Sequence, residues 1–260
     1  MKILKFEIKK QISSAVIWAM IIVGVFTGLM IALYPVYYES KDEVLKIIEG
    51  FPPQFAAAFG LQLDSIFSFS GFYSFGFSYI SLIGGIMASS ISIASFSRES
   101  RNKCSEFLLT KPISRKSIFV QKLLSGLCLL IATNVIYMIV AMYIGSSNDT
   151  DMFLAALSLF LTQLVFFTFG IAYATFAKKV RSVSGMATVF GFVAFILSAL
   201  VNMLEEESLR FVTPLKYFDP TDVFANGEYD IKYAVTGLII AIVCVTAAYF
   251  SFIKGDIKSV

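Results

Sequence analysis

The side chains with the best claim to a specific function lie in a charged segment, residues 98–122. It separates two long apolar stretches and carries seven of the 21 Lys and Arg residues. These seven residues are Arg98, Arg101, Lys103, Lys111, Arg115, Lys116 and Lys122. Such a segment can bind and position a partner in water, because a dense run of charge does not enter a membrane.

Catalytic chemistry has few candidate groups in this chain. The absence of histidine excludes His-ligated metal sites, Ser-His-Asp or Cys-His catalysis and HExxH zinc sites. Cys104, Cys128 and Cys244 are scattered without CxxC spacing, so no thiolate metal cluster or disulfide framework follows. The chain also has no GxxxxGK[ST] motif, and we expect it to bind neither a nucleotide nor any other cofactor.

The composition indicates a polytopic membrane protein. Hydrophobic residues make up 57% of the 260 residues, charged residues 15%, and the mean hydropathy is +0.79. Because a helix of about 20 apolar residues crosses a bilayer, the uncharged runs predict a single all-α transmembrane domain over residues 1–260. The six predicted spans are 13–36, 70–97, 117–145, 152–177, 182–204 and 233–253.

Shorter helices are expected outside these spans. The basic N-terminus, MKILKFEIKK, predicts an interfacial helix; the apolar region after it is too long for a signal peptide. Segments KDEVLKIIEGF and PPQFAAAFG predict short external helices after the first span. After the fifth span, Asp219 followed by Pro220 predicts the N-cap of a short helix at about 220–225.

The distribution of charge predicts the orientation. An even number of spans places both termini on one side, and only five of the 21 basic residues then fall on the other: Lys41, Lys46, Arg210, Lys216 and Lys232. This bias predicts cytoplasmic termini. The partition counts Lys122 with the charged segment and leaves no charge inside the uncharged runs, which disfavours a carrier driven through buried carboxylates.

Small and polar residues within the spans allow two interpretations. Ser89 and Ser92 in the second span, and Thr188, Gly191 and Ser198 in the fifth, form small-residue faces that could line a pathway or pack against neighbouring helices. Three further polar residues are Asn134, Thr162 and Gln163. For these three we favour interhelical hydrogen bonds over contact with a substrate.

The charged segment also contains a periodic pattern. Over about 99–110, apolar residues including Phe107 and Leu108 occupy one side of a helical projection, and Pro112 ends the pattern. Ser114 can then cap the third span. The pattern predicts a short amphipathic helix that transmits motion from a cytoplasmic partner. Periodicity alone fits equally well a solvated basic loop that fixes the topology.

The same stretch resembles a known family. The pattern E-x6-E-F-L-L-T-x-P-I-S-R-x-x-I is similar to the cytoplasmic segment between spans two and three of type 2 ABC transporter permeases. Its residues here are Glu99, Glu106, Phe107, Leu108, Leu109, Thr110, Pro112, Ile113, Ser114, Arg115 and Ile118. The family's usual Gly-Thr is Cys104-Ser105 in this chain. Residues 51–60, 213–230 and 253–257 resemble other parts of the same family.

The resemblance implies a transport subunit without enzymatic activity of its own. It would pair with a second permease subunit, identical or different, and with two ABC ATPase subunits that bind ATP and Mg²⁺. The coupling helix at about 99–110 would enter a groove of the ATPase. Polar contacts there would come from Glu99, Arg101, Glu106 and Arg115, and the apolar contact from Phe107 and Leu108, with Pro112 ending the helix.

The family resemblance also implies a place and a task. The protein would be an exporter in the bacterial cytoplasmic membrane, surrounded by lipid and without a nucleic-acid partner, with spans two and five lining the pathway. An uncharged pathway rich in Phe and Ser predicts a hydrophobic or amphipathic substrate, such as an antimicrobial peptide or a lipid-like molecule. The alternatives are an ATP-independent channel or carrier and, with few catalytic groups to support it, a membrane enzyme.

Overall fold

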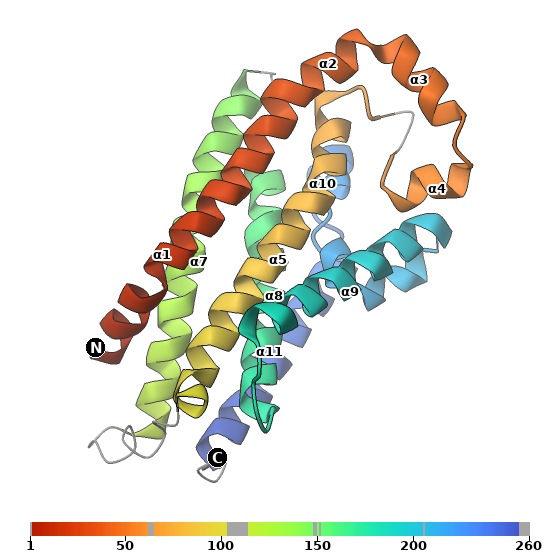
Figure 1. Ribbon diagram of the computed structural model, residues 1–260. Coiled ribbons are helices and arrows are strands. Elements are labelled where there is room, and N and C mark those ends of the chain that lie inside the picture. Colours follow the sequence, from red (N-terminus) through yellow and green to blue (C-terminus); the bar gives the residue numbers. More distant parts are fainter. Residues whose placement is uncertain are drawn as a thin grey trace.

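The computed structural model describes residues 2–61, 65–102, 114–147, 150, 152–204 and 206–254, apart from the side chains of Lys2 and Glu207. In this part of the chain all regular structure is helical, and six helices are long and apolar enough to cross a membrane. The predicted all-α class with six spans is therefore confirmed. Figure 1 shows the long helices running in a common general direction, with short helices gathered at one end.

The first span is a chain of three helical segments. α1 (Lys2–Thr27) continues without a break into a π-helix, η1 (Gly28–Leu33), and then into α2 (Tyr34–Glu39). The basic N-terminal segment is thus the first part of α1, where we expected a separate interfacial helix. This segment is packed into the bundle: Glu7 and Gln11 are buried, and Glu7 accepts hydrogen bonds from Gln11 and from Ser95 of a neighbouring helix.

The other five long helices are α5 (Phe69–Arg101), α7 (Arg115–Ser146), α8 (Phe153–Phe176), α9 (Val183–Leu204) and α11 (Ile231–Lys254). The beginnings of α1 and α7 and the ends of α5 and α11 meet at what we call the basal end. Both described chain ends lie there (Figure 1). We call the opposite end the distal end.

Short helices cover the distal end. α3 (Lys41–Glu49) and α4 (Pro53–Ala58) precede α5; the 3₁₀ helices η2 (Glu207–Val212) and η3 (Pro214–Lys216) and then α10 (Pro220–Asn226) follow α9. The predicted cap of α10 is confirmed, because Asp219 Oδ1 accepts a hydrogen bond from the Thr221 backbone N–H at 3.0 Å. Gly227 ends α10 with φ +75°, a left-handed backbone conformation that residues with a Cβ atom rarely adopt.

α5 is the central helix and packs most extensively against α8. Glycines permit this close approach: a Cβ atom on Gly170 would lie 2.0 Å from Ser92 Oγ, and one on Gly84 would lie 2.7 Å from Leu159 Cδ1. α1 and α7 pack side by side on one flank of α5. α9 contacts α5 on another flank and leans toward α4 (Figure 1).

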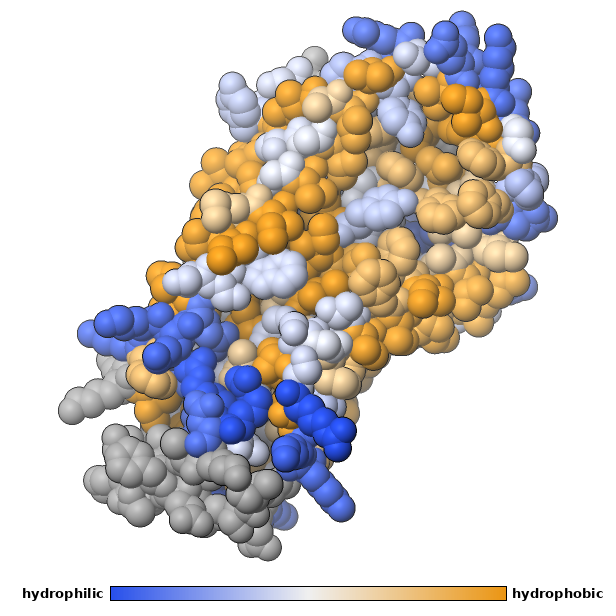
Figure 2. Space-filling view, viewed as in Figure 1, coloured by the Kyte–Doolittle hydropathy of each residue, from blue (hydrophilic) through white to orange (hydrophobic). Residues whose placement is uncertain are grey.

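The outward surfaces of the long helices are apolar. Large exposed side chains include Ile17 and Met20 on α1, Ile139 on α7 and Ile242 on α11. In Figure 2, hydrophobic residues cover the middle of the visible face and hydrophilic residues gather toward its two ends. Such a band suits a bundle surrounded by lipid, because apolar side chains that face hydrocarbon tails pay no hydrophobic penalty.

Candidate functional site

The structure defines both ends of the predicted coupling segment. Glu99 and Arg101 belong to the last turn of α5, and Arg115 is the first residue of α7. Ser114 caps α7 as expected, accepting a hydrogen bond from Ser117 N at 3.3 Å. Four predicted contact residues lie in 103–113, outside the described residues: Glu106, Phe107, Leu108 and Pro112. The segment therefore leaves from α5 and returns to α7 at the basal end.

Four charged side chains from three helices meet at this end, and we call them the basal charge cluster: Glu7 of α1, Arg98 and Glu99 of α5, and Lys122 of α7. Lys122 Nζ lies 2.5 Å from Glu99 Oε2 and 3.8 Å from Glu7 Oε1. Arg98 Nη1 lies 2.8 Å from Glu7 Oε2, as a close ion pair without an aligned hydrogen bond. The side chain of Lys122 is fully buried, and that of Glu7 is 1% exposed.

Hydrogen bonds complete the shell around the buried charges. Lys122 Nζ donates to the backbone oxygen of Ser95 at 2.5 Å, and Ser95 Oγ donates to Glu7 Oε2 at 3.2 Å. Gln11 Nε2 also donates to Glu7 Oε2, at 3.5 Å. Two cations and two anions make the cluster formally neutral. This pairing is what allows burial, because an isolated charge in an apolar interior is prohibitively costly.

The expectation that no charge enters the bundle is wrong for Glu7 and Lys122. Lys122 was counted with the charged segment because the uncharged run begins after it, although the predicted span 117–145 includes it. α7, however, begins at Arg115, so Lys122 lies two turns inside the helix. The predicted cap at Ser114 and the predicted start of the span at 117 both already indicated a position inside the helix. The partner carboxylate of Glu7, 115 positions earlier, has no comparable signal in the sequence.

The three described residues of the predicted docking set differ in their availability. The Glu99 side chain is 22% exposed and paired with Lys122. Arg115 Nη1 donates to the backbone oxygen of Ile253 at 3.2 Å, which joins the start of α7 to α11. Arg101 is exposed, and its Nε donates to Ser97 Oγ at 3.1 Å on its own helix. Arg101 is therefore the most accessible of these three to a partner.

The predicted pathway residues fall in three separate places. Ser89 and Ser92 are fully buried between α5 and α8, where Ser89 Oγ donates to the Phe166 backbone oxygen at 3.2 Å. Gly191 and Ser198 are buried on α9, and a Cβ atom on Gly191 would lie 2.4 Å from Ile86 Cγ1 of α5. Thr188 is exposed on the outer surface of α9. In this single chain they do not line one channel.

A buried polar layer joins α7 to α8. The predicted interhelical bond is confirmed for Asn134, whose Nδ2 donates to Gln163 Oε1 at 2.6 Å. Among the described residues, Asn134 Oδ1, Gln163 Nε2 and Thr162 Oγ1 are buried without a hydrogen-bond partner. Sequence reasoning missed a second polar pair, the hydroxyls of Tyr73 and Tyr137 at 2.9 Å, because both residues read as ordinary aromatic core.

In the described part of the chain, six apolar helices with hydrophilic residues gathered toward the two ends indicate a multi-pass membrane protein. Residues 1–257 match the family model described as "ABC-2 family transporter protein", and the chain belongs to that family. No curated protein matches the chain. The protein is therefore a membrane permease of an ABC transporter, the subunit that works with an ABC ATPase.

Proposed function

We propose that this chain is the transmembrane subunit of an ATP-driven exporter in the bacterial cytoplasmic membrane. Its basal end and both termini face the cytoplasm. Two separate ATPase subunits bind ATP and Mg²⁺, and a second permease subunit completes the pathway. The assembly moves a hydrophobic or amphipathic substrate, such as an antimicrobial peptide or a lipid-like molecule, by alternating access. The apolar outer face of α9, which carries Thr188, is our candidate for contact with the second permease.

The observation that carries this proposal is the basal charge cluster. The segment on which an ATPase would dock connects α5, which ends at Arg101, to α7, which begins at Arg115. Ion pairs centred on the buried side chains of Glu7 and Lys122 join the adjacent helix ends to each other and to α1. Since breaking a buried pair by removing one partner costs about 3–5 kcal/mol, a movement of the docking segment would displace the three helices together.

The proposed ATPase contact combines described and undescribed residues. Arg101 is exposed at the basal end, and the side chain of Glu99 is 22% exposed. Glu106, Phe107 and Leu108 would form the inserted part, with Pro112 ending the helix. Arg115 would contribute where α7 begins.

Mild-detergent affinity purification from the native membrane tests this function, with mass spectrometry of the bound proteins. We expect an ABC ATPase to co-purify, and to be lost from the Glu106→Ala/Phe107→Ala variant. A matched control is Lys46→Ala, at the distal end. A folded preparation without any ATPase, together with flux in vesicles that contain this chain alone, would instead establish an ATP-independent channel or carrier.

A further inference from the structure

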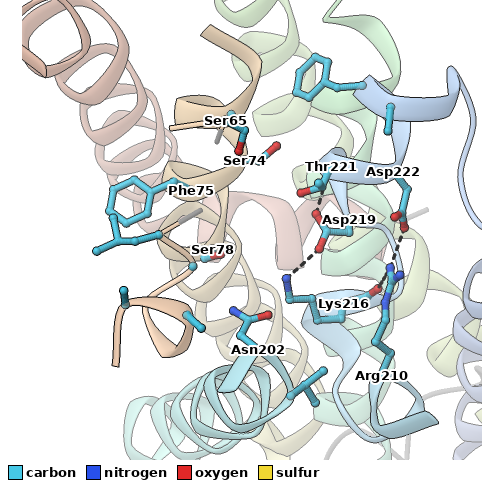
Figure 3. A pocket seen from close by; sticks show the side chains of 18 of the residues that line it. Ser65, Ser74, Phe75, Ser78, Asn202, Arg210, Lys216, Asp219, Thr221 and Asp222 are labelled. Atoms are coloured by element: carbon cyan, nitrogen blue, oxygen red, sulfur yellow. Dashed lines mark hydrogen bonds and ion pairs between the residues drawn. The ribbon is translucent and has the colours of Figure 1, made fainter. Parts of the chain in front are cut away.

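A hollow of about 860 Å³ opens at the distal end (Figure 3). Its walls come from four places in the chain: α4 with the residues after it, the beginning of α5, the end of α9, and the segment from Glu206 to Ala225. The volume lies within the roughly 300–1,000 Å³ typical of small-molecule sites. Neither the proposed ATPase contact nor the basal charge cluster uses any part of this hollow.

The ionised groups of the hollow are largely paired with one another. Lys216 Nζ lies 2.8 Å from Asp219 Oδ2, and Arg210 Nη2 lies 2.6 Å from Asp222 Oδ2. Glu206 is the remaining charged residue among the described lining residues, and it is exposed. An anion would meet three carboxylates against two cations already in ion pairs. The site therefore does not favour a negatively charged ligand.

Neutral polar groups in the hollow are unused. Ser74 and Ser78 lie one turn apart on α5, and Asn202 lies on α9; all three are half-buried. None of their side chains forms a hydrogen bond with another described residue. Figure 3 shows them around the same hollow. Two hydroxyls and a carboxamide offer both donors and acceptors to an uncharged ligand.

The remaining wall is apolar and partly aromatic. Phe75 and Phe224 line the hollow as half-buried rings, beside the small side chains of Ala56 and Ala57. A pyranose ring has matching chemistry, because hydroxyl groups surround its edge while its C–H faces pack on apolar or aromatic surfaces. A ligand of this kind could use the three free polar groups without breaking either ion pair.

We propose that this hollow is a binding site for a neutral, hydroxyl-rich group of one or two sugar rings. The group comes either from a free sugar or from the headgroup of a glycolipid in the adjoining membrane leaflet. Both sources present the same chemistry to Ser74, Ser78 and Asn202. This inference goes beyond the transport function and does not depend on it.

Calorimetric titration of the full chain in lipid nanodiscs tests the site. The free-sugar probe is maltose; the glycolipid probe is a dihexosyl diacylglycerol, compared in discs with and without it. We expect saturable binding that weakens at least about tenfold in the Ser74→Ala/Ser78→Ala/Asn202→Ala variant, since each lost hydrogen bond to a neutral group contributes a few-fold. Asn226→Ala, an exposed Asn of α10 outside the hollow, should bind as the unchanged chain does.

A second variant protects the test against misfolding of the first. Ala57→Trp fills the hollow from α4 and should abolish binding while the far-UV circular dichroism stays unchanged. Binding of both probes would show that the free sugar suffices, and binding of the glycolipid alone would assign the lipid source. Absence of saturable binding by both probes, undiminished binding in both variants, or saturation by inorganic phosphate in place of sugar would each overturn the proposal.

Discussion

At the scale of single residues, the basal charge cluster shows how a lysine is accommodated inside an apolar bundle. Lys122 is fully buried, and its ammonium contacts two carboxylates and a backbone oxygen. The ring of Phe96 adds a cation–π contact, with Nζ 5.8 Å from the ring centroid. Each neighbour offsets part of the cost of desolvation, so the removal of one member leaves the others buried and unbalanced.

Replacing Lys122 by Met should therefore destabilise the protein by about 3–5 kcal/mol, because Glu7 and Glu99 lose their shared cation. Denaturant unfolding in micelles measures the effect. Lys116→Met is the matched control: Lys116 is exposed on the same helix, and the change should be nearly neutral. Adding Glu7→Gln to the Lys122 variant should restore part of the loss. Equal stability of the Lys122 and Lys116 variants would contradict the structural role of the cluster.

A second residue-scale prediction concerns pH at the distal end. Burial by itself would raise the pKa of Asp219, but the Lys216 ammonium and the Thr221 hydrogen bonds outweigh it and lower the pKa from 3.8 to about 2. The carboxylate therefore stabilises the folded state fully above about pH 4. That contribution, about 2 kcal/mol, is lost as the pH falls from about 4 to 2.

Limited proteolysis with pepsin, which is active in acid, can follow this loss. Cleavage within 206–227 should accelerate below pH 4 in the unchanged chain. In the Asp219→Asn variant the cleavage rate should already be high at pH 4, and should vary across the window only as pepsin activity itself does. A parallel pH dependence in the two proteins would remove Asp219 from the explanation.

At the scale of helices, glycines at the contact determine how closely α5 and α8 approach, because a glycine has no side chain to keep the helices apart. Gly170 lies against Ser92 and the backbone of Ser89. A Cβ atom there would come within 2.9 Å of the Ser89 backbone oxygen, which cannot move aside as a flexible side chain would. The small residues that looked like a possible pathway from the sequence are, on this flank, part of a packed helix interface.

Gly170→Ala should accordingly lower the free energy of unfolding by about 1–3 kcal/mol through overpacking. Gly24→Ala on α1 is the control, because nothing lies within 4 Å of a Cβ atom at that exposed position. The control should leave stability unchanged or raise it by up to about 1 kcal/mol through better helix propensity. A Gly170 variant as stable as the Gly24 variant would mean that the two helices are farther apart than described here.

Helices and their order followed from the sequence because hydropathy and charge are local properties. The six spans, the caps at Ser114 and Asp219, and the interhelical hydrogen bonding of Asn134, though not its partner, all rest on residues whose type constrains their own surroundings. The basal charge cluster and the distal hollow did not follow. Each is assembled from segments far apart in the chain, and no residue type announces which distant side chain will face it.

At the scale of the whole molecule, the cluster predicts a coupling defect in the assembled transporter. Glu7→Gln removes a buried negative charge that holds Arg98 and Lys122 to α1. If the three helices move as one body, α1 should no longer follow the docking segment. We expect transport in proteoliposomes to fall severalfold relative to ATP hydrolysis by the partner. Glu39→Gln, exposed at the end of α2, should leave the ratio unchanged. Unimpaired coupling in the Glu7 variant would confine the cluster to a role in folding.

α5 has a mechanical consequence for the molecule as a whole. It is one unbroken helix of 33 residues, about 50 Å long at 1.5 Å per residue. Its Gly84 and Gly85 pack against Leu159 and Phe166 of α8. Ser74 stands near one end and Glu99 near the other. If a rigid helix of this length pivots about one end by about 5°, its other end moves roughly 4 Å sideways. A ligand in the distal hollow and an ATPase at the proposed docking segment would therefore act on opposite ends of the same rigid helix, so that force applied at one end would reach the other.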